Sequence, residues 1–316
     1  FYKEIFFLAK EKIFYSKLNE ETIRLEKKRI INEIELRQDS ADTNFFDIFF
    51  PFQANEEPSA LSIATGNIAE IDSTEQKDLH EVYKKYYTPQ NSVFLLSGPS
   101  SCEKDIKKYV LESFGSLSGK QGINIPSIHP TTLKRGIQKE IEKKGIRQCY
   151  FAFSFPISSV SFKEEYKLML LYTICNSSNS FLQEARDALG LYDISCGYFL
   201  LPKESLFYIY GTTGDKKDVQ KVLQLLLDYA SKRLKKISKE EWIEYKEKYL
   251  HWLLTNIQNN SFTMQMVGEY FMTTDEILNL RKKIALIESL TIGEMKNFME
   301  KALEVNMMNV FVINPQ

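Results

Sequence analysis

An internal repeat constrains the fold of this chain more than any other feature of its sequence. Residues 17–23 (Lys-Leu-Asn-Glu-Glu-Thr-Ile) recur as residues 236–242 (Lys-Ile-Ser-Lys-Glu-Glu-Trp), an offset of 219 positions (236 − 17). Two later matches follow in the same order, 79–86 with 295–302 at an offset of 216 (295 − 79) and 93–94 with 310–311 at 217 (310 − 93). Because these segments agree in order and spacing, we infer that one unit of helices and strands is present twice.

The hydrophobic pattern assigns helices and strands to both copies. Helices are predicted at residues 1–15, 19–37, 74–87, 106–114, 163–175, 180–188, 218–234, 239–258, 275–287 and 292–303. Strands are predicted at residues 93–97, 134–142, 149–155, 191–200, 206–212 and 309–313. The predicted fold class is α+β, with two homologous units that each hold a mostly antiparallel sheet faced by helices. The phenylalanine-rich stretch at 45–52 is expected to be core rather than a ligand cage.

The two copies are unequal in length. About 80 residues precede the second copy's helix at Asp218 (217 − 134 = 83), whereas the first copy opens at Phe1 inside a helical pattern, without a methionine or a signal peptide. We therefore expect a fragment whose first unit is incomplete and lacks a strand–strand–helix block. The expected boundaries are 1–118 for the C-terminal part of the first, site-bearing unit, 119–131 for a Gly- and Pro-containing linker, and 132–316 for a second, non-catalytic unit.

Glu26 and Glu33 lie on the predicted helix at 19–37, which Asn19 is expected to cap. They are seven residues apart, two helical turns, and therefore project from nearly the same side. That side adjoins an apolar face, so we expect each carboxylate to be paired, protonated or bound to a metal. The alternative is a charged amphipathic helix whose lysines neutralise its glutamates at i,i+4 spacing. The pattern of this helix alone favours the alternative.

The order of the segments resembles that of the insulinase/pitrilysin-type zinc peptidases, the inverzincins. The resemblance is carried by 25–34 (Leu-Glu-Lys-Lys-Arg-Ile-Ile-Asn-Glu-Ile), by parts of 66–98 and by 180–192, and it covers nearly the whole chain. It implies duplicated α+β units with the active site in the first, where the motif H-x-x-E-H supplies two zinc ligands and a general base. It also implies that Glu33 is the third zinc ligand and that Glu26 orients a ligand.

The motif H-x-x-E-H does not occur in this sequence. Its three histidines, His80, His129 and His251, have no second histidine four residues away. The repeat places the motif's helix in the block that we expect upstream of Phe1. We therefore expect zinc as the cofactor of the full-length parent, with none bound by this chain alone.

The resemblance also implies that Arg186 and Tyr192 bind substrate. The family usually spaces its arginine and tyrosine seven residues apart in the second unit. Here Arg186 and Tyr192 are six apart, and Asp193 stands where the tyrosine is expected.

Composition narrows the partners and the compartment. The 41 basic and 42 acidic side chains give a net charge of −1, which predicts neither a nucleic-acid nor a membrane partner. No apolar run is long enough to span a bilayer. The four cysteines are scattered without metal-type spacing, which favours reduced thiols and a cytoplasmic location.

Two functions from different classes follow. In the first, the parent is a zinc endopeptidase that cleaves extended peptides held between its two units, and this chain alone is inactive. In the second, the parent is a non-catalytic homologue that serves as a scaffold or partner subunit of an active peptidase. Retention of Glu26 and Glu33 favours the first, and the spacing of Arg186 and Tyr192 favours the second. The expected partners are a peptide or protein substrate and a related subunit in a homo- or heterodimer.

Overall fold

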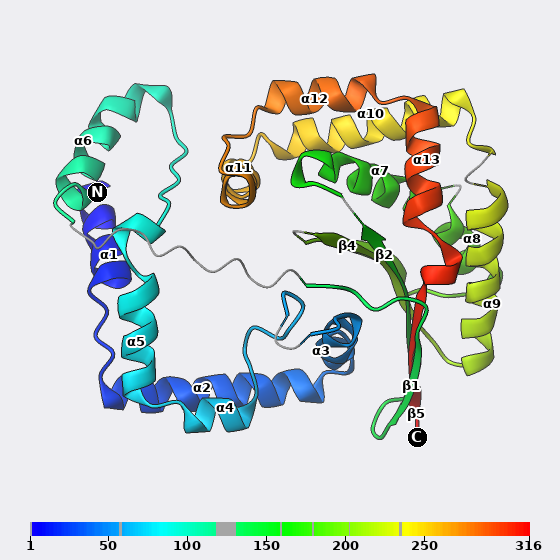
Figure 1. Cartoon of the computed structure of the whole chain (residues 1–316), viewed down its shortest axis with the longest axis horizontal. Coiled ribbons are helices and arrows are strands. Elements are labelled where there is room, and N and C mark those ends of the chain that lie inside the picture. The colour runs from blue at the N-terminus through cyan, green and yellow to red at the C-terminus, as the bar shows by residue number, and fades with distance from the viewer. Residues whose placement is uncertain are drawn as a thin grey trace. The chain divides into compact units, whose positions relative to one another are not determined.

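The computed structural model describes residues 2–56, 59–117, 131–158, 160–178, 180–201, 203–233 and 236–316. The chain forms two compact units (Figure 1), a first unit of Phe1–Ser40 with Ile63–Ile128 and a second unit of Ala41–Ser62 with His129–Gln316. The second unit thus includes a segment that lies within the predicted first domain, 1–118. The predicted boundaries of the homologous domains stay a prediction, because compactness and homology are different criteria. Most of the predicted linker, together with His129, lies outside the described residues.

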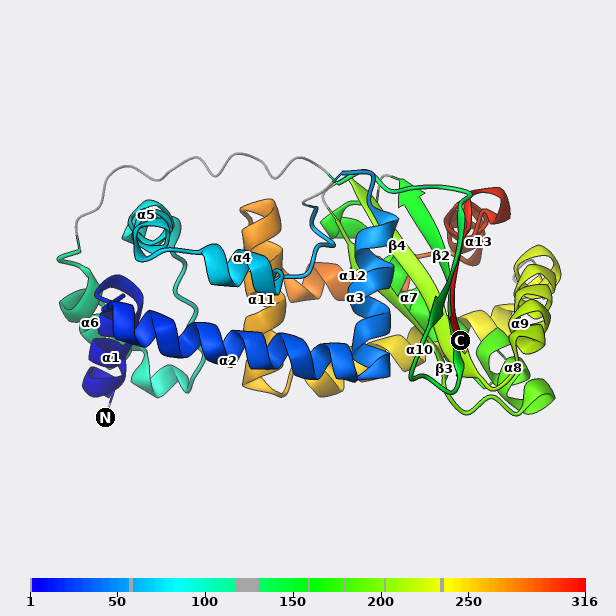
Figure 2. The same cartoon turned by 90° about the horizontal axis from the view of Figure 1, so that it is seen from below.

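The described part of the first unit is helical. Its elements are α1 (Tyr2–Phe14), α2 (Glu20–Asp39), α4 (Ile68–Ser73), α5 (Gln76–Tyr86), the short η1 (Pro89–Asn91) and η2 (Ser100–Cys102), and α6 (Glu103–Phe114). Helix α2 lies along α4 in both views (Figures 1 and 2), and α1 packs against α6. Phe6 contacts Phe94 and Phe114 edge to face, with ring centroids 5.7 and 6.3 Å away. The Tyr83 hydroxyl donates to the Ile13 carbonyl at 2.8 Å and so joins α5 to the end of α1.

The strand predicted at 93–97 is not formed. Among the described residues of the first unit no segment pairs with this one, and Val93, Phe94, Leu95 and Leu96 are all exposed. A strand is stabilised by hydrogen bonds and side-chain pairs with a neighbour, so apolar β-forming residues alone do not produce one. Its counterpart in the repeat is β5 (Asn309–Pro315), which pairs on both sides and is mostly buried.

The second unit is built on a five-stranded sheet. Its strands are β1 (Gln138–Lys143), β2 (Cys149–Ser158), β3 (Ile194–Leu200), β4 (Glu204–Thr213) and β5, in the order β1-β5-β2-β4-β3. The β1–β5 pair is parallel and the other three pairs are antiparallel, which confirms the predicted mostly antiparallel α+β unit. The strand β3 is one edge of this sheet.

Helices cover both faces of this sheet. They are α3 (Ala41–Gln53), the short η3 (Phe162–Glu164), α7 (Glu165–Cys175), α8 (Phe181–Leu189), α9 (Lys216–Asp228), the π-helical η4 (Tyr229–Arg233), α10 (Lys239–Asn256), α11 (Asn260–Thr274), α12 (Leu280–Ser289), α13 (Ile292–Ala302) and the short η6 (Val305–Met307). On one face Phe151, Phe153 and Phe155 point from β2 into a core shared with α7–α10 and α13. On the other face Phe45 and Phe49 of α3 pack against the sheet (Figures 1 and 2), which confirms that this stretch is core. In the residues that the structure describes, no helix has both the length and the apolar character needed to cross a membrane.

A fully buried polar cluster attaches α3 to the sheet. Gln53 Oε1 accepts hydrogen bonds from Ser154 Oγ at 2.7 Å and from Asn309 Nδ2 at 3.0 Å. Gln53 Nε2 donates to the Phe49 carbonyl at 3.2 Å, and Asn309 Nδ2 also donates to the Lys134 carbonyl at 2.8 Å. All three side chains are shielded from water, so each depends on its partners within the cluster.

The change Gln53→Leu is expected to lower the free energy of unfolding by about 1–3 kcal/mol, because it leaves the Ser154 hydroxyl and an Asn309 N–H without their buried acceptor. Gln224→Leu on the exposed side of α9 is the matched control and should change it by less than about 0.5 kcal/mol. Urea unfolding monitored by circular dichroism measures both. Equal effects of the two substitutions would show that the cluster contributes nothing specific.

Candidate functional site

Glu26 and Glu33 lie on α2, whose start is fixed as the sequence predicts. Asn19 has an extended backbone, and its side chain accepts from the Thr22 N–H at 2.8 Å. The Lys27 ammonium donates to the Asp72 carbonyl at 2.9 Å, which holds α2 against α4. Helix α2 therefore presents Glu26 and Glu33 from a capped, tethered element of 20 residues.

The structure leaves both carboxylates of α2 in solvent, beside an apolar face that is only partly buried. Glu26 and Glu33 are exposed, and the apolar side of α2 is only partly covered: Ile34 is buried, while Ile23, Ile30 and Ile31 are half-buried. Because both carboxylates stay in water, neither carries the cost of an unpaired buried charge. Their charges therefore do not require a metal or a partner for the fold to be stable.

The two glutamates differ in their partners. Glu26 forms an ion pair with Arg29 one turn further along α2. For Glu33, the described residues offer no hydrogen bond and no ion pair. Glu33 is therefore an exposed carboxylate on a rigid helix that is free to accept a cation.

Glu33 can supply one oxygen ligand to a metal. Within the described ranges, no group of three or more His, Cys, Asp and Glu side chains is arranged to hold a metal ion. A catalytic zinc takes three protein ligands, and carboxylate oxygen is among the atoms that it accepts. The donor chemistry of Glu33 thus fits zinc as one member of a ligand set.

The second unit repeats the helix that carries Glu33. Helix α10 begins 219 positions after α2 (239 − 20), and its cap Ser238, at the position matching Asn19, accepts from the Glu241 N–H at 3.1 Å. Helices α5 and α13 have 11 residues each and begin 216 positions apart (292 − 76). At the α10 offset, Trp252 is the counterpart of Glu33 (252 − 219 = 33) and Tyr245 that of Glu26 (245 − 219 = 26).

Trp252 lines a cavity of about 550 Å³ beside the edge strand β3. Tyr172 of α7 and Asn176, which follows the last residue of α7 as its C-cap, line the same cavity and lie four residues apart. Asn176 Nδ2 donates to the Tyr172 carbonyl at 2.9 Å and to Cys196 Sγ at 3.0 Å. Gly197 leaves room for the neighbouring Tyr208, because a Cβ at position 197 would lie 2.5 Å from the Tyr208 hydroxyl. We call this space the Trp252 cavity.

Asn176, which lines the Trp252 cavity, contacts a buried thiol, that of Cys196. Cys175 and Cys196 are buried, and the pKa of the Cys175 thiol lies well above its ordinary value because it hydrogen-bonds to Cys196 and is shielded from water. A protonated thiol is a poor metal ligand. The sequence interpretation did not identify this cavity, because Asn176 lies just past the helix predicted at 163–175 and the cavity needs other elements to form.

Arg186 and Tyr192 have different environments. Arg186 on α8 is half-buried, and its Nη2 donates to the Ile194 carbonyl at 2.7 Å, at the start of β3. Tyr192 lies between α8 and β3 and is 99% exposed. The structure therefore gives Arg186 a partner in its own chain and leaves Tyr192 in solvent. Their substrate-binding roles stay predictions.

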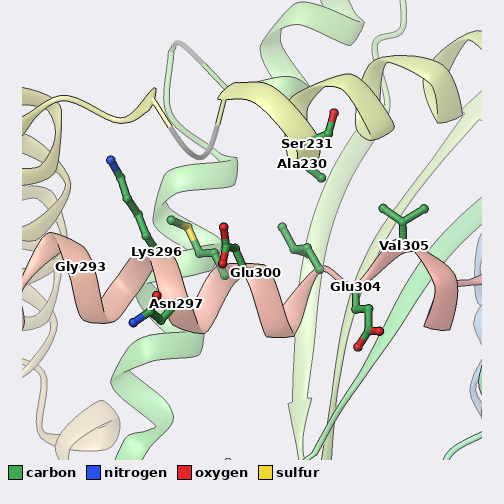
Figure 3. A pocket seen from close by; sticks show the side chains of 10 residues that line it. Ala230, Ser231, Gly293, Lys296, Asn297, Glu300, Glu304 and Val305 are labelled. Carbon is green, nitrogen blue, oxygen red and sulfur yellow. The ribbon is translucent and has the colours of Figure 1, made fainter.

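A further cavity of about 600 Å³ lies against α13 (Figure 3). Lys296 and Glu300 line it from α13, and Ser231 lines it from η4. The Lys296 ammonium already donates to the Ile237 carbonyl at 3.1 Å. None of the side chains predicted to act in a site lines this cavity.

Comparison with known proteins identifies the family. The peptidase M16 inactive domain matches residues 73–249. An uncharacterized zinc protease, YmxG of Bacillus subtilis (strain 168), is 24% identical over 280 residues, which cover 84% of this chain and 66% of that protein. The chain thus spans slightly less than two thirds of the length of this relative.

Solved structures agree in fold. A protease from Helicobacter pylori superposes with a TM-score of 0.84 at 18% identity, covering 99% of this chain and 76% of that one. A peptidase M16 inactive domain from Pseudomonas fluorescens gives 0.82 at 14% identity, covering 99% and 74%. The predicted membership in the insulinase/pitrilysin-type zinc peptidases is confirmed. With more than half of its residues matched by the inactive domain (249 − 73 + 1 = 177 of 316), this chain belongs to the peptidase M16 family.

Proposed function

We propose that this chain is the C-terminal portion of a zinc-dependent metalloendopeptidase-like protein that binds extended peptides, and that it is inactive alone. The observation that carries the proposal is Glu33, an exposed carboxylate without a partner among the described residues, on a capped helix. Membership in the M16 family and the similarity to a zinc protease support it.

In this proposal the residues of α2 have distinct roles. Glu33 would hold zinc as one of three protein ligands, and Glu26, which is paired with Arg29, would support a ligand. A zinc ion in such a site lowers the pKa of a bound water and polarises the scissile carbonyl. This chain contributes the Glu33 carboxylate on a helix that is fixed by its Asn19 cap and by Lys27.

A second candidate is a non-catalytic homologue that acts as the scaffold or partner subunit of an active peptidase. It is favoured by Arg186, whose guanidinium is used within the chain to hold the start of β3. It is also favoured by the nearly full exposure of the Tyr192 side chain. In this candidate the M16 fold supplies a surface, and no zinc is needed.

Zinc content and peptide cleavage separate the two candidates. The native polypeptide, including any residues encoded before Phe1, is compared with the 316-residue chain by metal analysis and with a quenched fluorescent peptide. The peptidase proposal expects about one zinc per native polypeptide, cleavage that a chelator stops, and neither property in the 316-residue chain. If the native polypeptide binds no zinc and cleaves no peptide, the peptidase proposal is wrong and the scaffold or partner-subunit candidate takes its place.

A further inference from the structure

A second cavity, which shares Met169, Tyr198 and Trp252 with the Trp252 cavity, has the character of a ligand pocket. It measures about 740 Å³ and lies between α7, α10, α11 and α12, beside the end of β3. This size is within the usual range for small-ligand sites. The walls are mostly aromatic and aliphatic and include Met169, Tyr198, Tyr249, Trp252, Phe262 and Met266. We call it the Lys283 cavity, after the cation that lines it.

An ion pair forms the polar part of the Lys283 cavity. Lys283 Nζ lies 3.1 Å from Glu165 Oε2, and its side chain is only 14% exposed. The Tyr198 hydroxyl donates to the other oxygen, Glu165 Oε1, at 3.2 Å. Burial and the nearby Glu165 charge raise the pKa of Tyr198, so its hydroxyl stays a donor. The cavity thus holds one positive and one negative group in contact.

This ion pair has hydrogen-bonding capacity left over. Among the described residues, Glu165 is the single acceptor of Lys283, although an ammonium has three donors. Each Glu165 oxygen accepts one bond, although a carboxylate oxygen can accept two. The other charged group along the cavity, Glu269, is exposed, and its carboxylate accepts from Gln265 Nε2 at 2.8 Å. The inner part of the cavity therefore offers a spare donor beside a spare acceptor, with no net charge.

An amide group on an apolar body matches this arrangement. A charged ligand would lose its water without a free counter-ion in the cavity, whereas an amide presents a carbonyl to the ammonium and an N–H to the carboxylate. We propose that the Lys283 cavity binds a large apolar side chain of a peptide, with the adjoining peptide amide hydrogen-bonded to Lys283 and Glu165. That the ligand is a peptide rests on the proposed function. The cavity itself contains neither Glu26 nor Glu33.

Neutral amino-acid amides test the proposal on the 316-residue chain. The probe is N-acetyl-L-phenylalaninamide, titrated by ligand-observed NMR. N-acetylglycinamide, which lacks the side chain, should bind at least about 10-fold more weakly. The charged analogues N-acetylphenylalanine and phenylalaninamide should also bind more weakly than the neutral probe. Of the two tryptophans, Trp242 is buried and Trp252 lines both this cavity and the Trp252 cavity, so a change in emission that is absent in Trp252→Phe places the probe beside Trp252. Met266 lines the Lys283 cavity and not the Trp252 cavity, so the Met266→Trp variant below tells the two apart.

Three variants locate the contacts. Lys283→Met should weaken binding by about 10-fold or more, because it removes the charged donor. Met266→Trp should also weaken binding, because a larger side chain occupies the space without touching the ion pair. Lys282→Met, at the exposed neighbouring position, is the matched control and should bind as the wild type does. Thermal unfolding of each variant shows that it is folded.

Equal affinity of wild type, Lys283→Met and Met266→Trp would overturn the proposal. So would tighter binding of either charged analogue, or equal binding of N-acetylglycinamide. The test is independent of zinc, because Glu33→Gln should leave probe binding unchanged. If the native polypeptide binds no zinc but the probe still binds, only the peptidase proposal is rejected. If zinc binds but the probe does not, only the Lys283 cavity proposal is rejected.

Discussion

Replacing Glu33 by Gln in the native polypeptide is expected to remove bound zinc and to lower peptide cleavage by more than about 100-fold. Loss of a group that merely supports a zinc ligand costs about 10- to 100-fold, and loss of a ligand itself should exceed that. The amide of Gln keeps the size of Glu33 but removes the negative charge that favours binding of a divalent cation. Zinc content by mass spectrometry and the initial rate of peptide cleavage measure the two effects.

Glu35→Gln is the matched control for this experiment. Glu35 is also an exposed glutamate of α2, but it is not the residue that matches Trp252 in the repeat. The Glu35→Gln substitution should leave zinc content and peptide cleavage unchanged. Both variants should change the free energy of unfolding by less than about 0.5 kcal/mol, because both side chains are exposed. A Glu33→Gln protein that keeps its zinc and its activity would show that Glu33 is not a ligand.

The sequence predicted well those helices and strands that are determined by residues close to one another in the chain. The cap at Asn19 and its counterpart at Ser238 fixed the starts of α2 and α10, because one side-chain oxygen satisfies a free N–H whatever surrounds the helix. The strands β2 and β4 were predicted nearly to their ends, because their alternating apolar residues pack in a sheet present in the structure. For such elements the neighbouring residues carry most of the information.

Elements that depend on distant neighbours were predicted less well. The segment 93–97 has the composition of a buried strand, but a strand requires a partner that local sequence does not reveal. Helix α11 was not predicted. A helix was expected to begin at Asp275, but Asp275 instead caps the end of α11 in the left-handed conformation, with φ of 56°, and α12 begins later, at Leu280. The Trp252 cavity was missed for a related reason: it exists only because α7, α10 and β3 converge.

The repeat leads to a second large effect, the creation of a zinc site in the second unit. Tyr172 of α7 and Asn176, the C-cap of that helix, lie four residues apart, which is also the spacing of the two histidines in H-x-x-E-H. Trp252 lines the same cavity from α10 and is the counterpart of Glu33. In the 316-residue chain, Tyr172→His, Asn176→His and Trp252→Glu together are expected to bind one zinc with a Kd below about 1 μM, that is, by more than about 8 kcal/mol. Cobalt absorption and zinc competition measure it.

The three positions suit these substitutions because each is partly open to water, with Tyr172 36% and Trp252 39% exposed, so the new histidines and carboxylate need not be buried unpaired. The double variant with both histidines but Trp252 intact is the first control and should bind at least about 10-fold more weakly for want of the third ligand. Repeating the test with Cys175 and Cys196 changed to Ser excludes thiol ligands.

If the triple variant binds no better than the double variant, Trp252 does not occupy the place of a metal ligand. The repeat would then no longer support Glu33 as a zinc ligand, and only the family resemblance would favour that role. If it binds as expected, the two units share one ligand geometry, filled in the first by a glutamate and in the second by a tryptophan.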